Sequence, residues 1–175
     1  MTDAPRLLTR IALFSALAYV LAWLCTYIPN VNLMYFVVFS AGFLWGLLPG
    51  LLVGAIGMGL WSALNPFGPA DPVVFVAQVV GMALCGVIGG LFRHGNWHRR
   101  SLGLQAVVMV GAAGLCTVLY YLPVNFADAW VYQPFWPRFT AGLVFMLWTL
   151  VSNAIAFPLL FGITKHLYAR ERVAV

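Results

Sequence analysis

Six apolar runs, each closed by Pro, Gly, Asn or a basic cluster, dominate this sequence. A helix that crosses a bilayer needs roughly 20 apolar residues, and most of these runs approach or exceed that length. They predict an all-α membrane protein, with residues 1–175 forming a single transmembrane domain of six helices. The helices are expected at about residues 7–28, 33–48, 51–64, 73–92, 102–122 and 139–168.

The second and third runs are short, and only Pro49-Gly50 separates them. Together they are too long for one crossing, so we expect two helices in a tight hairpin. Short spans that are interrupted by Pro and Gly tend to surround a cavity rather than face lipid.

The composition excludes the other broad classes of protein. Apolar residues make up 63% of the chain and charged residues 7%, whereas soluble domains are about half apolar and a quarter charged. The three cysteines lie inside apolar runs, which argues against a disulfide framework. The net charge of +5 comes from short basic flanks and does not indicate nucleic-acid binding.

Lys and Arg predict the orientation of the bundle. With six crossings, eight of these nine residues fall on the side that holds both termini, and only Arg138 falls on the other. Cytoplasmic flanks are enriched in Lys and Arg, so both termini are expected in the cytoplasm. The eight residues are Arg6, Arg10, Arg93, Arg99, Arg100, Lys165, Arg170 and Arg172.

The three loops expected on the outer face are residues 28–32, 65–72 and 123–138. The third is long, aromatic and rich in proline, and we expect it to form a stiff lid over the bundle. An interfacial belt of aromatic residues is the alternative interpretation of its Trp and Tyr residues.

Polar and aromatic residues converge near this outer face from four helices and the loops. Gln78 would lie roughly 8 Å below the face at 1.5 Å per residue, and an amide at that depth should point inward. An interhelical hydrogen bond is the alternative role for Gln78, and Asn153 is expected to be structural. The candidate binding residues are Asn32, Tyr35, Trp61, Asn65, Asp71, Gln78, Tyr121, Asn125, Trp136 and Arg138.

Small residues recur every fourth position in the first run, ALFSALAYVLA, and in the glycine-rich runs. This spacing allows helices to approach closely. For the glycines, packing within the chain is the simpler interpretation. For the first run, a smooth alanine face could also dock a second protein.

Catalytic and energy-coupling signals are missing. The chain has no phosphate-binding P-loop motif and no charged residue in the middle of a span. His94 and His98 lack an evident third metal ligand, and Cys85 is interpreted as a buried, inert thiol. We therefore expect no catalytic, metal or cofactor site, and a binding protein in the bilayer whose energy is supplied by something else.

The chain resembles the substrate-binding S components of energy-coupling factor (ECF) transporters. The resemblance rests on ALFSALAYVLA, on IPNVN before the second helix, and on NPFGPADPVVFVAQVVGMALCGVIGG. It implies a multi-pass subunit of the bacterial cytoplasmic (inner) membrane that binds a vitamin near the outer surface. It also implies partners, namely a transmembrane T subunit and two ATPases, with Ala12 and Ala16 as docking contacts.

Alternative functions remain open at this point. One is a structural membrane subunit, resembling the small cell-shape scaffold protein MreD. Another is a solitary transporter of the cobalamin type, which works without a dedicated ATPase module. A third is an enzyme or ion-coupled carrier that uses Cys85 or the His94/His98 pair.

Overall fold

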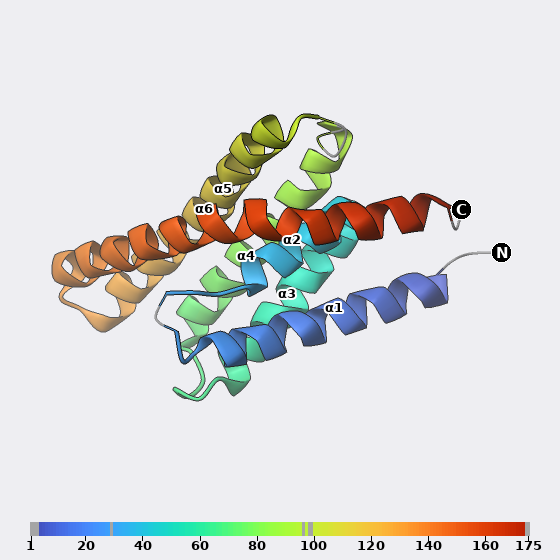
Figure 1. The fold of residues 1–175 in the computed structure, drawn as a ribbon. Helices are drawn as coiled ribbons and strands as arrows, with labels where there is room; N and C mark the ends of the chain where they lie inside the picture. The colour runs from blue at the N-terminus through green and yellow to red at the C-terminus, as the bar shows by residue number, and fades with distance from the viewer. Residues whose placement is uncertain (1–3, 29, 96, 98–99, 174–175) are drawn as a thin grey trace.

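A computed structural model describes residues 4–28, 30–95, 97 and 100–173, and in this part of the chain every regular element is helical. Figure 1 shows long helices packed side by side. The helices are α1 (Ala4–Cys25), α2 (Met34–Trp45), α3 (Leu47–Leu64), α4 (Pro72–Phe92), the 3-10 turn η1 (Arg93–Gly95), α5 (Leu102–Tyr132) and α6 (Phe135–Val173).

Five of these helices, all except α2, are long and apolar enough to cross a membrane. Their outward faces carry many large apolar side chains, such as Leu13, Trp148 and Leu159. A water-soluble protein rarely exposes apolar patches of this extent. The surface therefore suits hydrocarbon, as the composition predicts.

Helix α2 lies at the centre of the bundle. Every residue from Met34 to Leu44 is buried, and the helix packs against α1, α3, α4 and α6. Phe39 and Phe43 stack on each other and contact Phe157 and Phe161 of α6. Because neighbours surround it, α2 can be apolar on all sides.

The break between α2 and α3 falls at Gly46 and not at the expected Pro49-Gly50. Gly46 has a φ of 103°, a backbone conformation that favours glycine. Pro49 is the third residue of α3, within the first turn, where its missing N–H leaves no helical hydrogen bond unmade.

Glycines allow α2, α3 and α4 to touch along their backbones. A Cβ atom at Gly42 or Gly50 would overlap the carbonyl oxygen of Gly86, and one at Gly86 would overlap the carbonyl oxygen of Gly50. A Cβ atom at Gly89 would likewise overlap the carbonyl oxygen of Phe39. We call this contact between the three helices the glycine seam.

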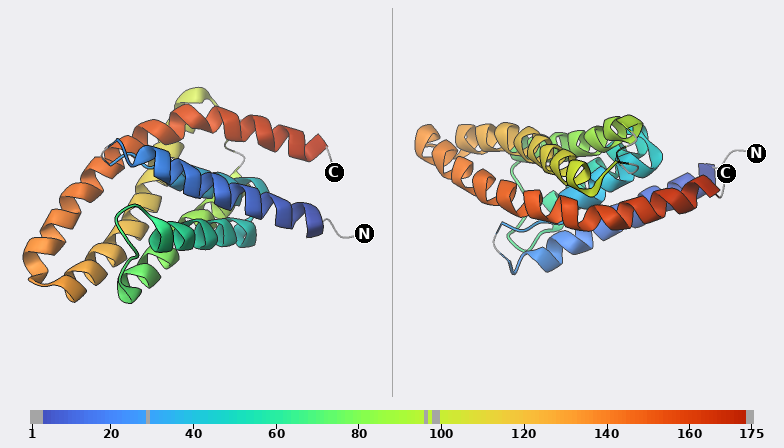
Figure 2. Two further views of the ribbon diagram at one scale, coloured as in Figure 1. Left: turned by 90° about the horizontal axis from the view of Figure 1, so that it is seen from below. Right: turned by 45° about the horizontal axis from the view of Figure 1, so that its top comes forward.

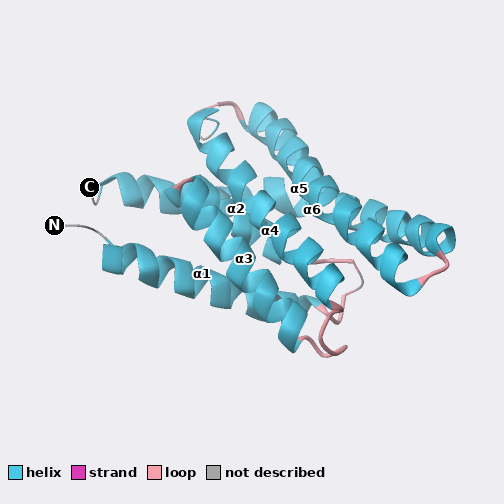
Figure 3. Ribbon diagram, turned by 180° about the vertical axis from the view of Figure 1, so that it is seen from behind, coloured by secondary structure: helices cyan, strands magenta, loops and turns pink. Residues whose placement is uncertain are grey.

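The expected lid over residues 123–138 is wrong. Helix α5 continues through Pro123 to Tyr132, α6 begins at Phe135, and only Gln133 and Pro134 connect them. The segment is a helical hairpin that projects beyond the other helices, as Figure 3 shows. Helix α6 also bends along its length (Figure 2), with Pro158 in its interior.

The bundle has two ends that differ in their connections. The loop end carries the connections 26–33, 65–71 and 133–134, and the basic end carries both termini and the α4–α5 connection. At the basic end, Arg10 of α1 forms an ion pair with Glu171 of α6. Arg99 and the side chain of Arg172 lie outside the described part of the chain.

Candidate functional site

A hollow of about 570 Å³ opens at the loop end between α4, α5 and α6. Its size lies within the range of small-molecule sites. Four of the ten candidate residues line it, and they come from all three helices. These are Gln78, Tyr121, Asn125 and Arg138.

A second hollow of about 300 Å³ adjoins the first, since Asn30 and Tyr121 line both. It lies among α1, α2, α3, α5 and α6 and contains most of the aromatic side chains of the site. The candidates Asn32, Tyr35 and Trp61 line this second hollow. Seven of the ten sequence candidates therefore face one continuous region.

Two amide groups in the first hollow have unused hydrogen-bond donors. Gln78 accepts a hydrogen bond from Ser62 through Oε1 (2.6 Å), but its Nε2 has no partner among the described residues. Asn125 is only 7% exposed, and its Nδ2 is likewise without a partner there. A buried donor without a partner costs about 1–3 kcal/mol, so the Asn125 amide favours a ligand that carries an acceptor atom. The half-buried Gln78 amide offers a second donor in the same hollow.

Gly142 of α6 makes room for the Asn125 amide. A Cβ at position 142 would lie 2.5 Å from Asn125 Oδ1 and 2.8 Å from its Nδ2. The close approach of α6 to α5 therefore depends on glycine here, and it buries the amide at the wall of the hollow.

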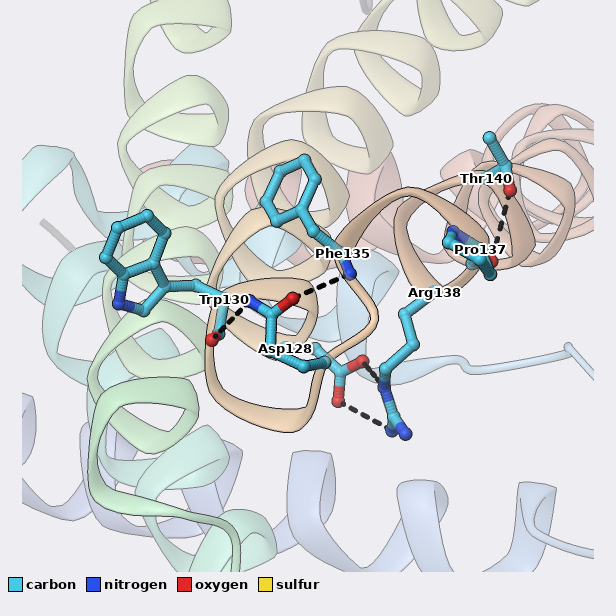
Figure 4. A network of polar contacts seen from close by, with 7 residues as sticks. Asp128, Trp130, Phe135, Pro137, Arg138 and Thr140 are labelled. Carbon is cyan, nitrogen blue, oxygen red and sulfur yellow. Dashed lines mark hydrogen bonds and ion pairs between the residues drawn. The ribbon is translucent and has the colours of Figure 1, made fainter.

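An ion pair between Asp128 and Arg138 lies at the rim of the first hollow. Arg138 Nε donates to Asp128 Oδ2 (3.0 Å), and its Nη2 lies 3.4 Å from Oδ1. Figure 4 shows the guanidinium facing this carboxylate, with Trp130 directed away from the pair. Arg138 also lies over the ring of Tyr132, 4.9 Å from its centroid. Its charge is therefore balanced within the protein.

Aromatic rings line the second hollow, and one of them, Tyr121, lines both hollows. The Tyr121 hydroxyl is 2.8 Å from Thr149 Oγ1, and its ring meets that of Tyr120 edge to face. Tyr120 in turn packs against Tyr35, while the Trp61 ring contacts Trp23 of α1. These contacts hold the rings in fixed orientations, which suits the stacking of a flat ligand.

Three sequence candidates line neither hollow. Asp71 caps α4, because its Oδ1 accepts the backbone N–H of Val73 (2.8 Å). Asn65 holds its own loop through hydrogen bonds to the backbone of Trp61, Phe67 and Gly68. Trp136 is 71% exposed and packs against Phe135.

Other lining residues did not emerge from the sequence. Asn30 lies between the hollows with a positive φ of 58°, and its place beside Pro29 suggested only a turn. Thr149 and Phe145 come from the middle of an apolar run and carry no pattern. Asp128 was expected in a loop, which concealed its pairing with Arg138.

Helix α1 presents Ala12 and Ala16 on its outer side. Both are exposed, whereas Ile11, Ser15 and Ala18 face the core. Each alanine contributes only a methyl group, so a neighbouring helix could approach α1 closely at this position.

Cys85 is buried in the core of the bundle. Cys85 donates through Sγ to the carbonyl oxygens of Gly81 and Cys116, at 3.4 Å each, and lines neither hollow. Among the described residues, no three His, Cys, Asp or Glu side chains lie together as metal ligands. His98 lies outside the described residues.

Asn153 donates through Nδ2 to Thr117 Oγ1 (2.9 Å) in the core.

A family model described as "ECF transporter, substrate-specific component" matches residues 6–168. The chain belongs to this family. The match confirms the resemblance found in the sequence and makes the chain a substrate-specific transport subunit, embedded in the membrane by several apolar helices. ECF substrate-specific components are transport subunits rather than enzymes. The comparisons with curated proteins and with solved structures gave no match.

Proposed function

We propose that this ECF substrate-specific component captures a vitamin or related micronutrient at the loop end of its bundle. A T subunit and two ATPase subunits then supply the energy for transfer across the bacterial cytoplasmic membrane. The observation that carries the proposal is the pair of unused amide donors, Gln78 Nε2 and Asn125 Nδ2, in a hollow of ligand size.

The lining favours a particular kind of ligand. Unused N–H donors require acceptor atoms, such as carbonyl oxygens or ring nitrogens. The fixed rings of Tyr35, Trp61 and Tyr121 favour a flat aromatic system. Asp128 already neutralises Arg138 at the rim. The part of the ligand that lies beside this pair should therefore carry no net charge.

The test of this function is native mass spectrometry of the protein purified from cells grown in rich medium. We expect a co-purified organic molecule of defined mass that dissociates on activation in the gas phase. Calorimetry with a panel of vitamins should then identify a ligand of submicromolar affinity. A complete panel without binding, on protein that remains folded, would contradict the proposal.

Replacing Asn125 with leucine is expected to weaken ligand binding by about 10- to 100-fold. Leucine has a similar size but no donor, so a ligand acceptor would stay unpaired at a cost of about 1–3 kcal/mol. Calorimetry with the identified ligand measures the effect. The matched control is Thr140→Val, which removes an exposed hydroxyl from α6 outside both hollows. Equal loss of affinity in both variants would show that Asn125 does not contact the ligand.

We further propose six crossings, with both termini in the cytoplasm and residues 1–175 as one transmembrane domain. The distribution of charge supports this orientation, since the basic end carries Arg6, Arg10, Arg93, Lys165 and Arg170. In this arrangement the loop end, with its two hollows, faces the exterior.

Cysteine labelling tests this orientation. The native cysteines Cys25, Cys85 and Cys116 are all buried, so a membrane-impermeant maleimide should give little background. Phe67→Cys, at a loop-end position that is 79% exposed, should be labelled in intact cells. Ala4→Cys and Ser101→Cys, at the basic end, should react only after the membrane is permeabilised. The reverse pattern would overturn the orientation, and a split between Ala4→Cys and Ser101→Cys would overturn the number of crossings.

We also propose that Ala12 and Ala16 form the contact with the T subunit. Their exposure on the outer side of α1 supports this role, because small side chains let a partner helix approach closely.

A further inference from the structure

A separate hollow of about 310 Å³ lies between α5 and α6 near the basic end. Met109, Pro158 and Leu159 contribute apolar surface, and Gln105 and Lys165 contribute the polar groups. It shares no lining residue with the two hollows at the loop end. The proposed function does not use it.

Lys165 places a positive charge on the wall of this hollow. Its Nζ donates to Gln105 Oε1 (2.7 Å) and lies 5.9 Å from the centroid of the Phe161 ring. Gln105 is only 6% exposed and is anchored by a hydrogen bond from its Nε2 to the carbonyl oxygen of Arg100 (2.6 Å). The ammonium is therefore held in place by a buried amide and not by a flexible surface contact.

No carboxylate in the described part of the chain balances this charge. Glu171, the acidic residue described at the basic end, pairs with Arg10, while Asp71 and Asp128 lie at the loop end. An ammonium group has three donors, and the structure gives Lys165 one hydrogen bond, to a neutral partner. A half-buried charge of this kind favours an anionic partner.

The flanks of the hollow face outward. Leu102 is 77% exposed and Leu159 is 75% exposed, and in a membrane protein such leucines contact lipid. Gly162 widens the hollow, since a Cβ there would meet no atom within 4 Å. A suitable occupant thus has an anionic head at Lys165 and an apolar chain between the helices.

We propose that this hollow binds an anionic phospholipid from the leaflet at the basic end. The phosphate contacts Lys165, and an acyl chain lies along Met109, Pro158 and Leu159. Basic pockets between transmembrane helices are a recurrent type of site for anionic headgroups. The bound lipid fills the gap between α5 and α6 at this end.

Native mass spectrometry can test the site with phosphatidylglycerol and phosphatidylcholine of identical chains, added in equal amounts to delipidated protein. We expect the wild type to retain phosphatidylglycerol over phosphatidylcholine by about fivefold, the effect of one basic residue near a membrane surface. Lys165→Gln should bring this ratio close to one. Arg170→Gln is the matched control, since Arg170 is exposed at the same end and does not line the hollow.

Two further arms distinguish a lipid in this hollow from free phosphate and from lipid bound elsewhere on the bundle. Gly162→Leu should fill the hollow and reduce retention of both lipids, in protein that still elutes as a folded species. Inorganic phosphate at millimolar concentration should not displace phosphatidylglycerol. Equal retention of the two lipids by the wild type, an unchanged ratio in Lys165→Gln, or full displacement by phosphate would each overturn the proposal.

Discussion

Replacing Gly86 with alanine is expected to prevent folding of the bundle, whereas Gly111→Ala should leave it intact. Position 86 belongs to the glycine seam, where an added methyl group would overlap the carbonyl oxygen of Gly50 in α3. The atom in the way is backbone, so no side-chain rotation relieves the overlap. Overpacking in a core usually costs about 1–3 kcal/mol, and here relief requires α3 and α4 to separate.

The experiment compares the yield of monodisperse protein in detergent and the midpoint of thermal unfolding. Gly111 is the matched control, because it lies in α5 and a Cβ there would meet no atom within 4 Å. Alanine is also about 1 kcal/mol more favourable than glycine inside a helix, so Gly111→Ala should not lower the midpoint. A Gly86→Ala protein with the elution profile and midpoint of the wild type would refute the close contact.

Replacing Ala16 with tryptophan is expected to abolish uptake while leaving ligand binding unchanged. Ala16 is exposed on α1, whereas the hollows open at the loop end. A bulky ring would hold a partner helix away from α1, and the tight contact that small residues allow would be lost. The purified variant should therefore bind its ligand like the wild type but fail to co-purify the T and ATPase subunits.

Gly111→Trp is the control for this second experiment, since it adds the same ring to an exposed position of α5. It should retain both uptake and the partner subunits. Normal uptake in Ala16→Trp would show that α1 does not form the contact. Loss of ligand binding in that variant would instead indicate damage to the fold.

The sequence predicted the helical class and the positions of most helices because apolar runs are a strong signal in membrane proteins. It failed where proline was taken as a helix end. Pro49 and Pro137 lie in the first turns of α3 and α6, where the N–H that proline lacks has no helical partner. Pro123 lies inside α5, and membrane helices tolerate such positions.

The site was only partly predictable for a related reason. Gln78 was identified because amides are rare and costly in apolar runs, and Asn125 was identified as a polar residue of the expected outer loop 123–138. The Asp128–Arg138 pair was not, because it exists only when residues 123–138 form two helices that lie side by side. Asp71 could have been interpreted correctly, since an Asp followed by Pro is a common start of a helix.

The central position of α2 has a consequence for how this helix is held in the membrane. Twelve residues of helix extend about 18 Å, well short of the roughly 30 Å of hydrocarbon in a bilayer. Such a segment is too short to cross the hydrocarbon by itself. Its stable place in the membrane therefore depends on the neighbouring helices that enclose it.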